Sequence, residues 1–285
     1  MAETIRKNMR QKEGDRAFSF LPLNVREGKP RTRGLSEIRG PYYTPMGRRY
    51  LEDVLETMGD YIDILKFAAG SFSLMPRKMV KELIDLCHRF DVRVDTGGFI
   101  EHVLALGPGA VTQYIEECKR LEFDIIEVSS GFISIPADDL IRLTEKVRKA
   151  GLKPKVEVGI QFGAGGASAV EELEAEGIGD PDWAIQNARR HLDAGAYMIM
   201  IESEGITESV RTWRKDVISK FARELGLDQT MFEAADPEVF IWYVKNYGPE
   251  VNLFVDHSQI VQLECLRSGI WGTKDVWGRI LTYKG

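Results

Sequence analysis

The 285-residue sequence lacks the features that mark several large classes of protein. No apolar run approaches the roughly 20 residues of a membrane-spanning helix, and the N-terminal stretch MAETIRKNMRQKEGDR has no apolar core of the secretory type. The P-loop and the GxGxxG spacing of nucleotide-binding folds are also missing. We therefore expect no membrane partner and no binding of a nucleotide through one of these motifs.

Cysteine is scarce, and the excess of charge is negative. Cys87, Cys118 and Cys265 are odd in number and widely spaced, which predicts reduced thiols in a cytoplasmic protein rather than disulfides or a zinc site. The formal net charge of −6 disfavours nucleic acid as a partner. Chemistry in this chain should therefore depend on groups other than cysteine.

What the sequence does contain is a regular alternation of short apolar runs and amphipathic stretches of helix length. Such alternation is typical of a parallel sheet with crossover helices. Because eight such units follow one another, they favour a (β/α)8 TIM barrel over an open Rossmann-type sheet. We expect one barrel domain over residues 35–285, preceded by a loosely held N-terminal tail and connector over residues 1–34.

Several of the apolar runs end in a carboxylate followed by small residues. In DIIEVSSG, KVEVG and YMIMIESEG these acids are Glu127, Glu157 and Glu202. The two-residue period of a strand turns them inward, together with Lys66 at the end of the second strand. Since barrel enzymes build their active sites at the carboxyl ends of the strands, we expect these four side chains to share one cavity.

A cluster of this composition can hold a hard cation and transfer protons. Carboxylate oxygens are the ligands that Mg²⁺ prefers, and a lysine beside the metal can hold an anionic oxygen or donate a proton. A buried ion-pair network that only fills the barrel is the structural alternative, and the sequence leaves both open.

Other strand ends offer groups that can bind an anion. Gly97 and Gly98 can present backbone N–H groups, although a tight turn without a ligand explains them equally well. After the last strand, His257 can take part in acid–base work and Ser258 lies near a helix start, where barrels often bind phosphate. Arg39 belongs to the densest basic patch, which is either a solvated face or an anion funnel. The segment GAGG (residues 163–166) is typical both of a flexible lid over the barrel mouth and of a flexible loop without such a function.

The ordered segments DYIDILKFAAGS, TGGFIEH, EVSSGFISI, KVEVG and GPEVNLFVDHSQIVQLECLRSGIWGT resemble the phosphosulfolactate synthase family. The variants FAAGSFSLMP, EVGIQFGAGG, IESEGITE and FEAADPEVF are similar to the eukaryotic branch that includes plant heat-stress-associated proteins. The resemblance runs from about Leu35 to Thr273. It implies a (β/α)8 barrel that uses Mg²⁺ to add sulfite to phosphoenolpyruvate.

The resemblance completes a candidate site with three groups of residues. Glu101 enters through the matching motifs alone, whereas Glu233 also ends an apolar run, in MFEAAD. The catalytic group is Lys66, Glu101, Glu157 and Glu202. The Mg²⁺ group is Glu127, Glu157, Glu202 and Glu233. The group that binds the small anionic substrate is Arg39, Gly97, Gly98, Ser129, His257 and Ser258.

The chain also departs from the family pattern at basic positions. The family carries a lysine just after the EVG element, where this chain has Ile160 and Gln161, and an arginine near Glu202 that is missing here. We therefore weigh two functions: a synthase-like lyase acting on a phospho-acid, and a barrel that has lost catalysis and serves as a stress-related binding protein. Assembly as a homo-oligomer stays open.

Overall fold

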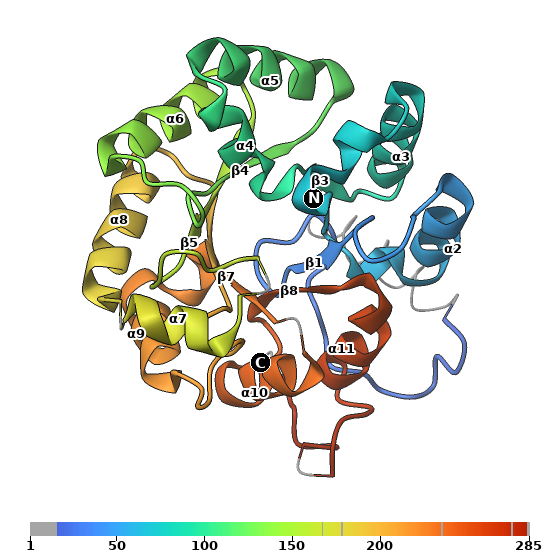
Figure 1. Ribbon diagram of the computed structural model, residues 1–285. Helices are drawn as coiled ribbons and strands as arrows, with labels where there is room; N and C mark the ends of the chain where they lie inside the picture. Colours follow the sequence, from blue (N-terminus) through green and yellow to red (C-terminus); the bar gives the residue numbers. More distant parts are fainter. Residues whose placement is uncertain (1–15, 167, 178, 235, 275, 284–285) are drawn as a thin grey trace.

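The computed structural model describes residues 16–166, 168–177, 179–234, 236–274 and 276–283. Within these ranges the chain forms a closed barrel of eight parallel strands in chain order, with β1 paired to both β2 and β8 (Figure 1). The predicted (β/α)8 barrel is therefore confirmed. The strands are β1 (Ser36–Arg39), β2 (Ile64–Lys66), β3 (Arg93–Asp95), β4 (Ile125–Val128), β5 (Lys153–Val158), β6 (Met198–Ile201), β7 (Thr230–Glu233) and β8 (Asn252–Asp256).

Helices connect the strands and surround the barrel (Figure 1). The α-helices are α2 (Arg48–Met58), α3 (Arg77–Arg89), α4 (Ile100–Ala105), α5 (Pro108–Leu121), α6 (Ala137–Lys149), α7 (Val170–Glu176), α8 (Pro181–Asp193), α9 (Lys215–Leu225), α10 (Pro237–Tyr247) and α11 (Ile260–Arg267). Short 3-10 turns are η1 (Gly59–Tyr61), η2 (Ala68–Leu74), η3 (Gly97–Phe99), η4 (Leu227–Gln229) and η5 (His257–Gln259).

The helix before the seventh strand is shorter than its sequence pattern predicts. The pattern extends over residues 209–226, whereas α9 begins only at Lys215. Ser209 has a positive φ of 53°, and the Arg214 N–H donates to the Ile206 carbonyl, so the backbone of this segment is held in a turn. The loop that follows β6 is correspondingly long.

Strand alternation separates the buried side chains into two apolar clusters. One lies between strands and helices and includes Val156 and Ile199. The other fills the barrel interior and includes Met198 and Met200. The predicted facing of β5 and β6 is confirmed, because neighbouring side chains on a strand point to opposite faces.

The segment just before β1 contacts the body of the barrel. The Lys29 ammonium donates to the carbonyls of Gly59 and Phe90, at 2.8 Å each, and the buried Arg31 donates to the Asp60 carbonyl. Residues 1–15 lie outside the described residues, and a domain boundary at residue 35 stays a prediction. No helix in the described part of the chain has both the length and the apolar character needed to cross a bilayer.

Candidate active site at the barrel mouth

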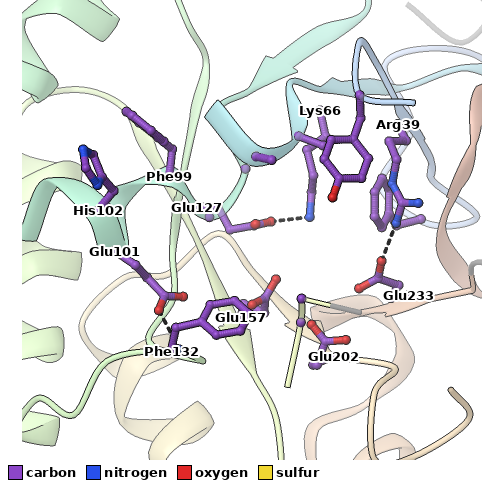
Figure 2. Close-up of a pocket in the computed structure, with 18 of the residues that line it drawn as sticks. Arg39, Lys66, Phe99, Glu101, His102, Glu127, Phe132, Glu157, Glu202 and Glu233 are labelled. Atoms are coloured by element: carbon purple, nitrogen blue, oxygen red, sulfur yellow. Dashed lines mark hydrogen bonds and ion pairs between the residues drawn. The ribbon is translucent and has the colours of Figure 1, made fainter. Parts of the chain in front are cut away.

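A cavity of about 520 Å³ opens at the carboxyl ends of the strands (Figure 2). Charged side chains from six strand ends line it, joined by Glu101 of α4. The charged lining residues are Arg39, Lys66, Glu101, Glu127, Glu157, Glu202 and Glu233. The structure thus brings together Lys66, Glu127, Glu157 and Glu202, which the sequence predicts to share one cavity, while their individual roles stay predictions.

Beneath the cavity floor lies an ion network centred on Lys155. Its Nζ is 2.7 Å from both carboxylate oxygens of Glu37, 2.5 Å from Asp95 Oδ2 and 2.9 Å from Glu127 Oε2. Glu127 Oε2 is also 2.7 Å from Lys66 Nζ. The sequence places Lys155 inside the barrel but does not reveal Glu37 and Asp95 as its partners. Glu127 therefore joins this buried network to the cavity.

The two lysines determine which of these groups carry charge. Burial alone would raise the pKa of Glu127, but the ammonium groups of Lys155 and Lys66 lower it to about 2. Burial raises the pKa of Asp95 to about 7, despite the nearby Lys155. Burial alone would lower the pKa of Lys66. The attraction of the Glu127 carboxylate is stronger than this effect, so the pKa of Lys66 rises above its usual value. Lys66 is therefore protonated in the resting protein and presents a positive charge to the cavity.

Two further carboxyl groups line the cavity, and no cation in the described part of the chain contacts either of them. Burial and then the neighbouring carboxylates raise the pKa values of Glu157 and Glu202 well above the usual range. Glu202 Oε1 accepts hydrogen bonds from the Glu204 N–H at 2.9 Å and from the Ser203 hydroxyl at 3.4 Å. Among the described residues, Glu157 has no hydrogen bond or ion pair. This part of the cavity would gain stability from a bound cation.

The two cations that line the cavity, Arg39 and Lys66, both lie close to one aromatic ring. The Phe254 ring centroid is 4.2 Å from Lys66 Nζ and 5.1 Å from Arg39 Cζ. Arg39 also donates to Glu233 at 2.9 Å and to the Tyr43 hydroxyl at 2.7 Å. These contacts fix the two positive groups on the β1–β2 side of the mouth, where an anion could bind between them.

The predicted glycine turn lies at the cavity, but its N–H groups are only partly free. Gly97 has a φ of +61°, and its N–H donates to Asp95 Oδ1 at 2.9 Å. Gly98 lines the cavity, and a side chain there would press on Ser129 Oγ. Ser129 itself is buried behind Gly98, with its hydroxyl 3.5 Å from the Gly98 carbonyl. Gly97 and Gly98 therefore both form part of the cavity lining.

Three residues expected to bind the anion do not line the cavity: Ser129, which is buried, and His257 and Ser258. The ring of His257 contacts the Arg39 carbonyl at 3.1 Å and the Tyr50 hydroxyl at 2.9 Å. The hydroxyl and N–H of Ser258 both donate to Asp256 Oδ1, at 2.6 and 2.9 Å. The η5 turn directs both groups into these local contacts, so the structure gives them a role in holding the end of β8.

Glu101 lines the cavity and also positions a neighbouring loop. Its carboxylate accepts the N–H groups of Gly131 and Phe132, at 3.0 and 2.8 Å. These contacts hold the segment after β4 against α4. The sequence gives no indication of this contact, because the partners are about 30 positions apart and two of the three groups are backbone.

A carboxylate also holds the glycine-rich loop over the mouth. Glu204 accepts the N–H groups of Gly165, Gly166 and Ser168, at 2.7, 3.3 and 3.0 Å. The loop is therefore tied to the segment after β6. Gln161, the second residue after the EVG element, does not line the cavity, and its amide donates to the carbonyls of Leu173 and Gly177.

The carboxylates suit Mg²⁺ in their chemistry. Within the described ranges, no group of three His, Cys, Asp or Glu side chains is arranged to hold a metal ion unaided. However, a Cβ added to Gly165 would lie 2.9 Å from Glu202 Oε2 and 3.9 Å from Glu157 Oε1, so two carboxylates approach one point. Since Mg²⁺ is usually bound through one or two carboxylates, waters and substrate oxygens, this donor set fits.

Comparisons with known proteins agree on one family. The sequence model of (2R)-phospho-3-sulfolactate synthase matches residues 24–273. The chain is 40% identical over 259 residues to Protein HEAT-STRESS-ASSOCIATED 32 of Arabidopsis thaliana, covering 87% of this chain and 91% of that protein. It is 29% identical over 271 residues to the phosphosulfolactate synthase of Methanothermobacter thermautotrophicus, covering 93% and 98%.

A solved structure with a similar fold is the carboxyl transferase domain of Rhizobium etli pyruvate carboxylase. It matches with a TM-score of 0.56 and 12% identity, over 79% of this chain and 40% of that chain. At this identity the likeness shows the fold alone.

Proposed function

The chain belongs to the (2R)-phospho-3-sulfolactate synthase family, and we propose that its barrel mouth adds sulfite to phosphoenolpyruvate or a related phospho-acid in a Mg²⁺-dependent reaction. The observation that carries this proposal is the convergence of charged side chains from six strand ends on one cavity. Cations on the β1–β2 side face carboxylates on the β5–β6 side, which provides separate places for an anion and a metal.

In this reaction the sulfur lone pair of sulfite forms a bond to the methylene carbon of phosphoenolpyruvate. The electrons of the double bond move to the neighbouring carbon and its carboxylate, and that carbon then takes up a proton. Mg²⁺, when bound by Glu157 and Glu202, would supply Lewis-acid stabilisation of the enolate charge. No bond to phosphorus breaks, so the phosphate stays on the product.

The remaining steps fall to the chain's own basic groups. Arg39, held by Glu233 and Tyr43, is placed to bind the phosphate or carboxylate of the substrate. Lys66 Nζ is placed to hold the oxygen on which charge develops and to give its proton to the substrate carbon. Glu127, which contacts the Lys66 ammonium at 2.7 Å, keeps that group charged and oriented.

A second function, binding without catalysis, is favoured by a different observation. The resemblance implies a family lysine where this chain has Ile160 and Gln161, and the Gln161 amide is engaged with two carbonyls of the α7 segment. Five carboxyl groups line the cavity against two cations among the described residues, and each of them that is ionised disfavours a metal-free anion.

The two functions can be separated by one assay. The measurement is consumption of phosphoenolpyruvate by the purified protein, with and without sulfite and with and without millimolar Mg²⁺. We expect consumption only when both are present, and a loss of kcat/KM of about 100-fold or more in Lys66→Met. Lys149→Met, which removes an exposed lysine on α6, is the matched control. Absence of sulfite-dependent consumption in the wild type would favour the binding function.

A further inference from the structure

The cavity has two chemically different halves. One half is lined by charged side chains from strand ends. The other half is mostly apolar and comes from the segments after β2, β3 and β4, where Glu101 and His102 of α4 are the polar exceptions. Its apolar lining residues are Ala68, Ala69, Phe99, Ala105, Phe132 and Ile133. Figure 2 shows Phe99 on the side of the cavity opposite Arg39 and Glu233, with Phe132 projecting between them beside Glu157. A ligand that fills the whole cavity must therefore meet both kinds of surface.

The apolar half is built from positioned rings. Glu101 accepts the backbone N–H of Phe132 at 2.8 Å, and the Phe132 ring lies against Gly166. Phe99 packs edge-to-face on Phe72, with ring centroids 5.3 Å apart. These contacts fix the direction of both rings, so the wall is present before a ligand binds.

Phe132 is left half in solvent by this arrangement. Its side chain is 52% exposed although its backbone is tied to the buried Glu101. Contact between aromatic surface and water is unfavourable. An apolar ligand group packed against the ring would therefore gain binding free energy by removing that surface from water. Phosphoenolpyruvate is polar over nearly its whole surface and would leave this wall uncovered. The cavity, at about 520 Å³, falls in the range of roughly 300–1,000 Å³ found for larger, drug-sized ligands.

We propose that the substrate of this cavity is an acid with two parts. A phosphate or carboxylate head binds between Arg39 and Lys66, and an apolar arm of aromatic or branched-chain size packs on Phe132, Phe99 and Ile133. The inference rests on the proposed function, because it names the substrate class of the same site. It makes the chain an enzyme for a substituted phospho-acid, with the bare three-carbon acid as a poorer ligand.

The test compares two stable ligands that share one head group. The affinities of 2-phospholactate and 2-phospho-3-phenyllactate are measured by isothermal titration calorimetry, with Mg²⁺ and without sulfite. We expect the phenyl ligand to bind more tightly by about tenfold or more, because its ring removes apolar surface from water. In Phe132→Ala, we expect this preference to fall below about threefold.

Phe162→Ala is the matched control variant. Phe162 has the same exposure of 52% but lies outside the cavity lining, so its replacement should keep the full preference for the phenyl ligand. Melting curves of both variants verify that each is folded.

Each remaining result overturns the inference. If the phenyl ligand binds no more tightly than 2-phospholactate, the proposed apolar arm is refuted, whereas the proposed head-group site is not. A preference that survives in Phe132→Ala shows that the arm does not pack on this wall. If neither ligand binds, the proposed head-group site is refuted as well. The proposed function is tested separately from these three binding outcomes, by the assay of sulfite-dependent phosphoenolpyruvate turnover.

Discussion

Replacing Lys155 by methionine tests the ion network beneath the cavity. Lys155 is fully buried and contacts three carboxylates, at 2.5 to 2.9 Å. Methionine keeps a similar apolar length but leaves Glu37 and Asp95 buried without their cation, whereas Glu127 keeps Lys66. Removing one partner of a buried ion pair costs about 3–5 kcal/mol, because the other charge stays desolvated.

Protonation limits this loss. Burial already raises the pKa of Asp95 to about 7, so this carboxyl group can become neutral when Lys155 is removed. We therefore expect the free energy of unfolding to fall by about 3 kcal/mol at neutral pH, toward the lower end of that range. The double variant Lys155→Met with Asp95→Asn should recover about 1 kcal/mol, because a neutral amide is less costly to bury than a charge.

The assay is urea unfolding followed by far-ultraviolet circular dichroism. Lys149→Met on α6 is the control, because Lys149 is exposed and pairs with Glu145 at i,i+4, an interaction worth about 0.5 kcal/mol or less. A loss below about 1 kcal/mol in Lys155→Met would refute the reasoning, since it would mean that the carboxylates do not depend on this cation.

Three further predictions concern a buried histidine, the glycine-rich loop and the metal. Burial lowers the pKa of His191 to about 4 from its ordinary 6.5, so the unfolded chain takes up this proton first as the pH falls. The free energy of unfolding should therefore fall by up to about 3 kcal/mol between pH 6.5 and 4 because of this group. Unfolding curves of His191→Gln should lack that fall, and the same pH dependence in the wild type and the variant would contradict this. Glu204→Gln weakens the acceptor of three backbone N–H groups, so limited proteolysis should cut loop 163–168 several-fold faster, and an unchanged rate would count against the tether. Millimolar Mg²⁺ should raise the melting temperature of the wild type by a few degrees and that of Glu157→Gln or Glu202→Gln less, and equal shifts in all three proteins would exclude these ligands.

The barrel and much of its mouth could be predicted because both follow from local periodicity. Eight alternations of strand and helix determine the architecture, and the two-residue period determines which side chains face inward. That period turns Glu127 and Lys155 inward from neighbouring strands without any knowledge of tertiary contacts. Lys66 follows by the same rule at the end of β2, since Ile64 two positions earlier is also an interior residue.

Contacts across the barrel could not be predicted in this way. Lys155 on β5 reaches Glu37 on β1 and Asp95 on β3, neither of which is a neighbouring strand. Alternation gives the face of a side chain but not its depth, which depends on how the strands are staggered when the sheet closes. Ser258 shows the same limit at short range, because its hydroxyl is bound by Asp256 two positions earlier.

The charge balance of the mouth indicates how an anion could bind there. Arg39 is paired with Glu233 and Lys66 with Glu127, while Glu157 and Glu202 have no cation in contact among the described residues. An anionic substrate that arrived alone would add to this negative charge, whereas a substrate that arrives with Mg²⁺ brings the missing positive charge to those two carboxylates. Linkage then requires each to raise the affinity of the other by the same factor. We therefore predict that Mg²⁺ and a phospho-acid bind cooperatively, which titration of each ligand in the presence and absence of the other would measure.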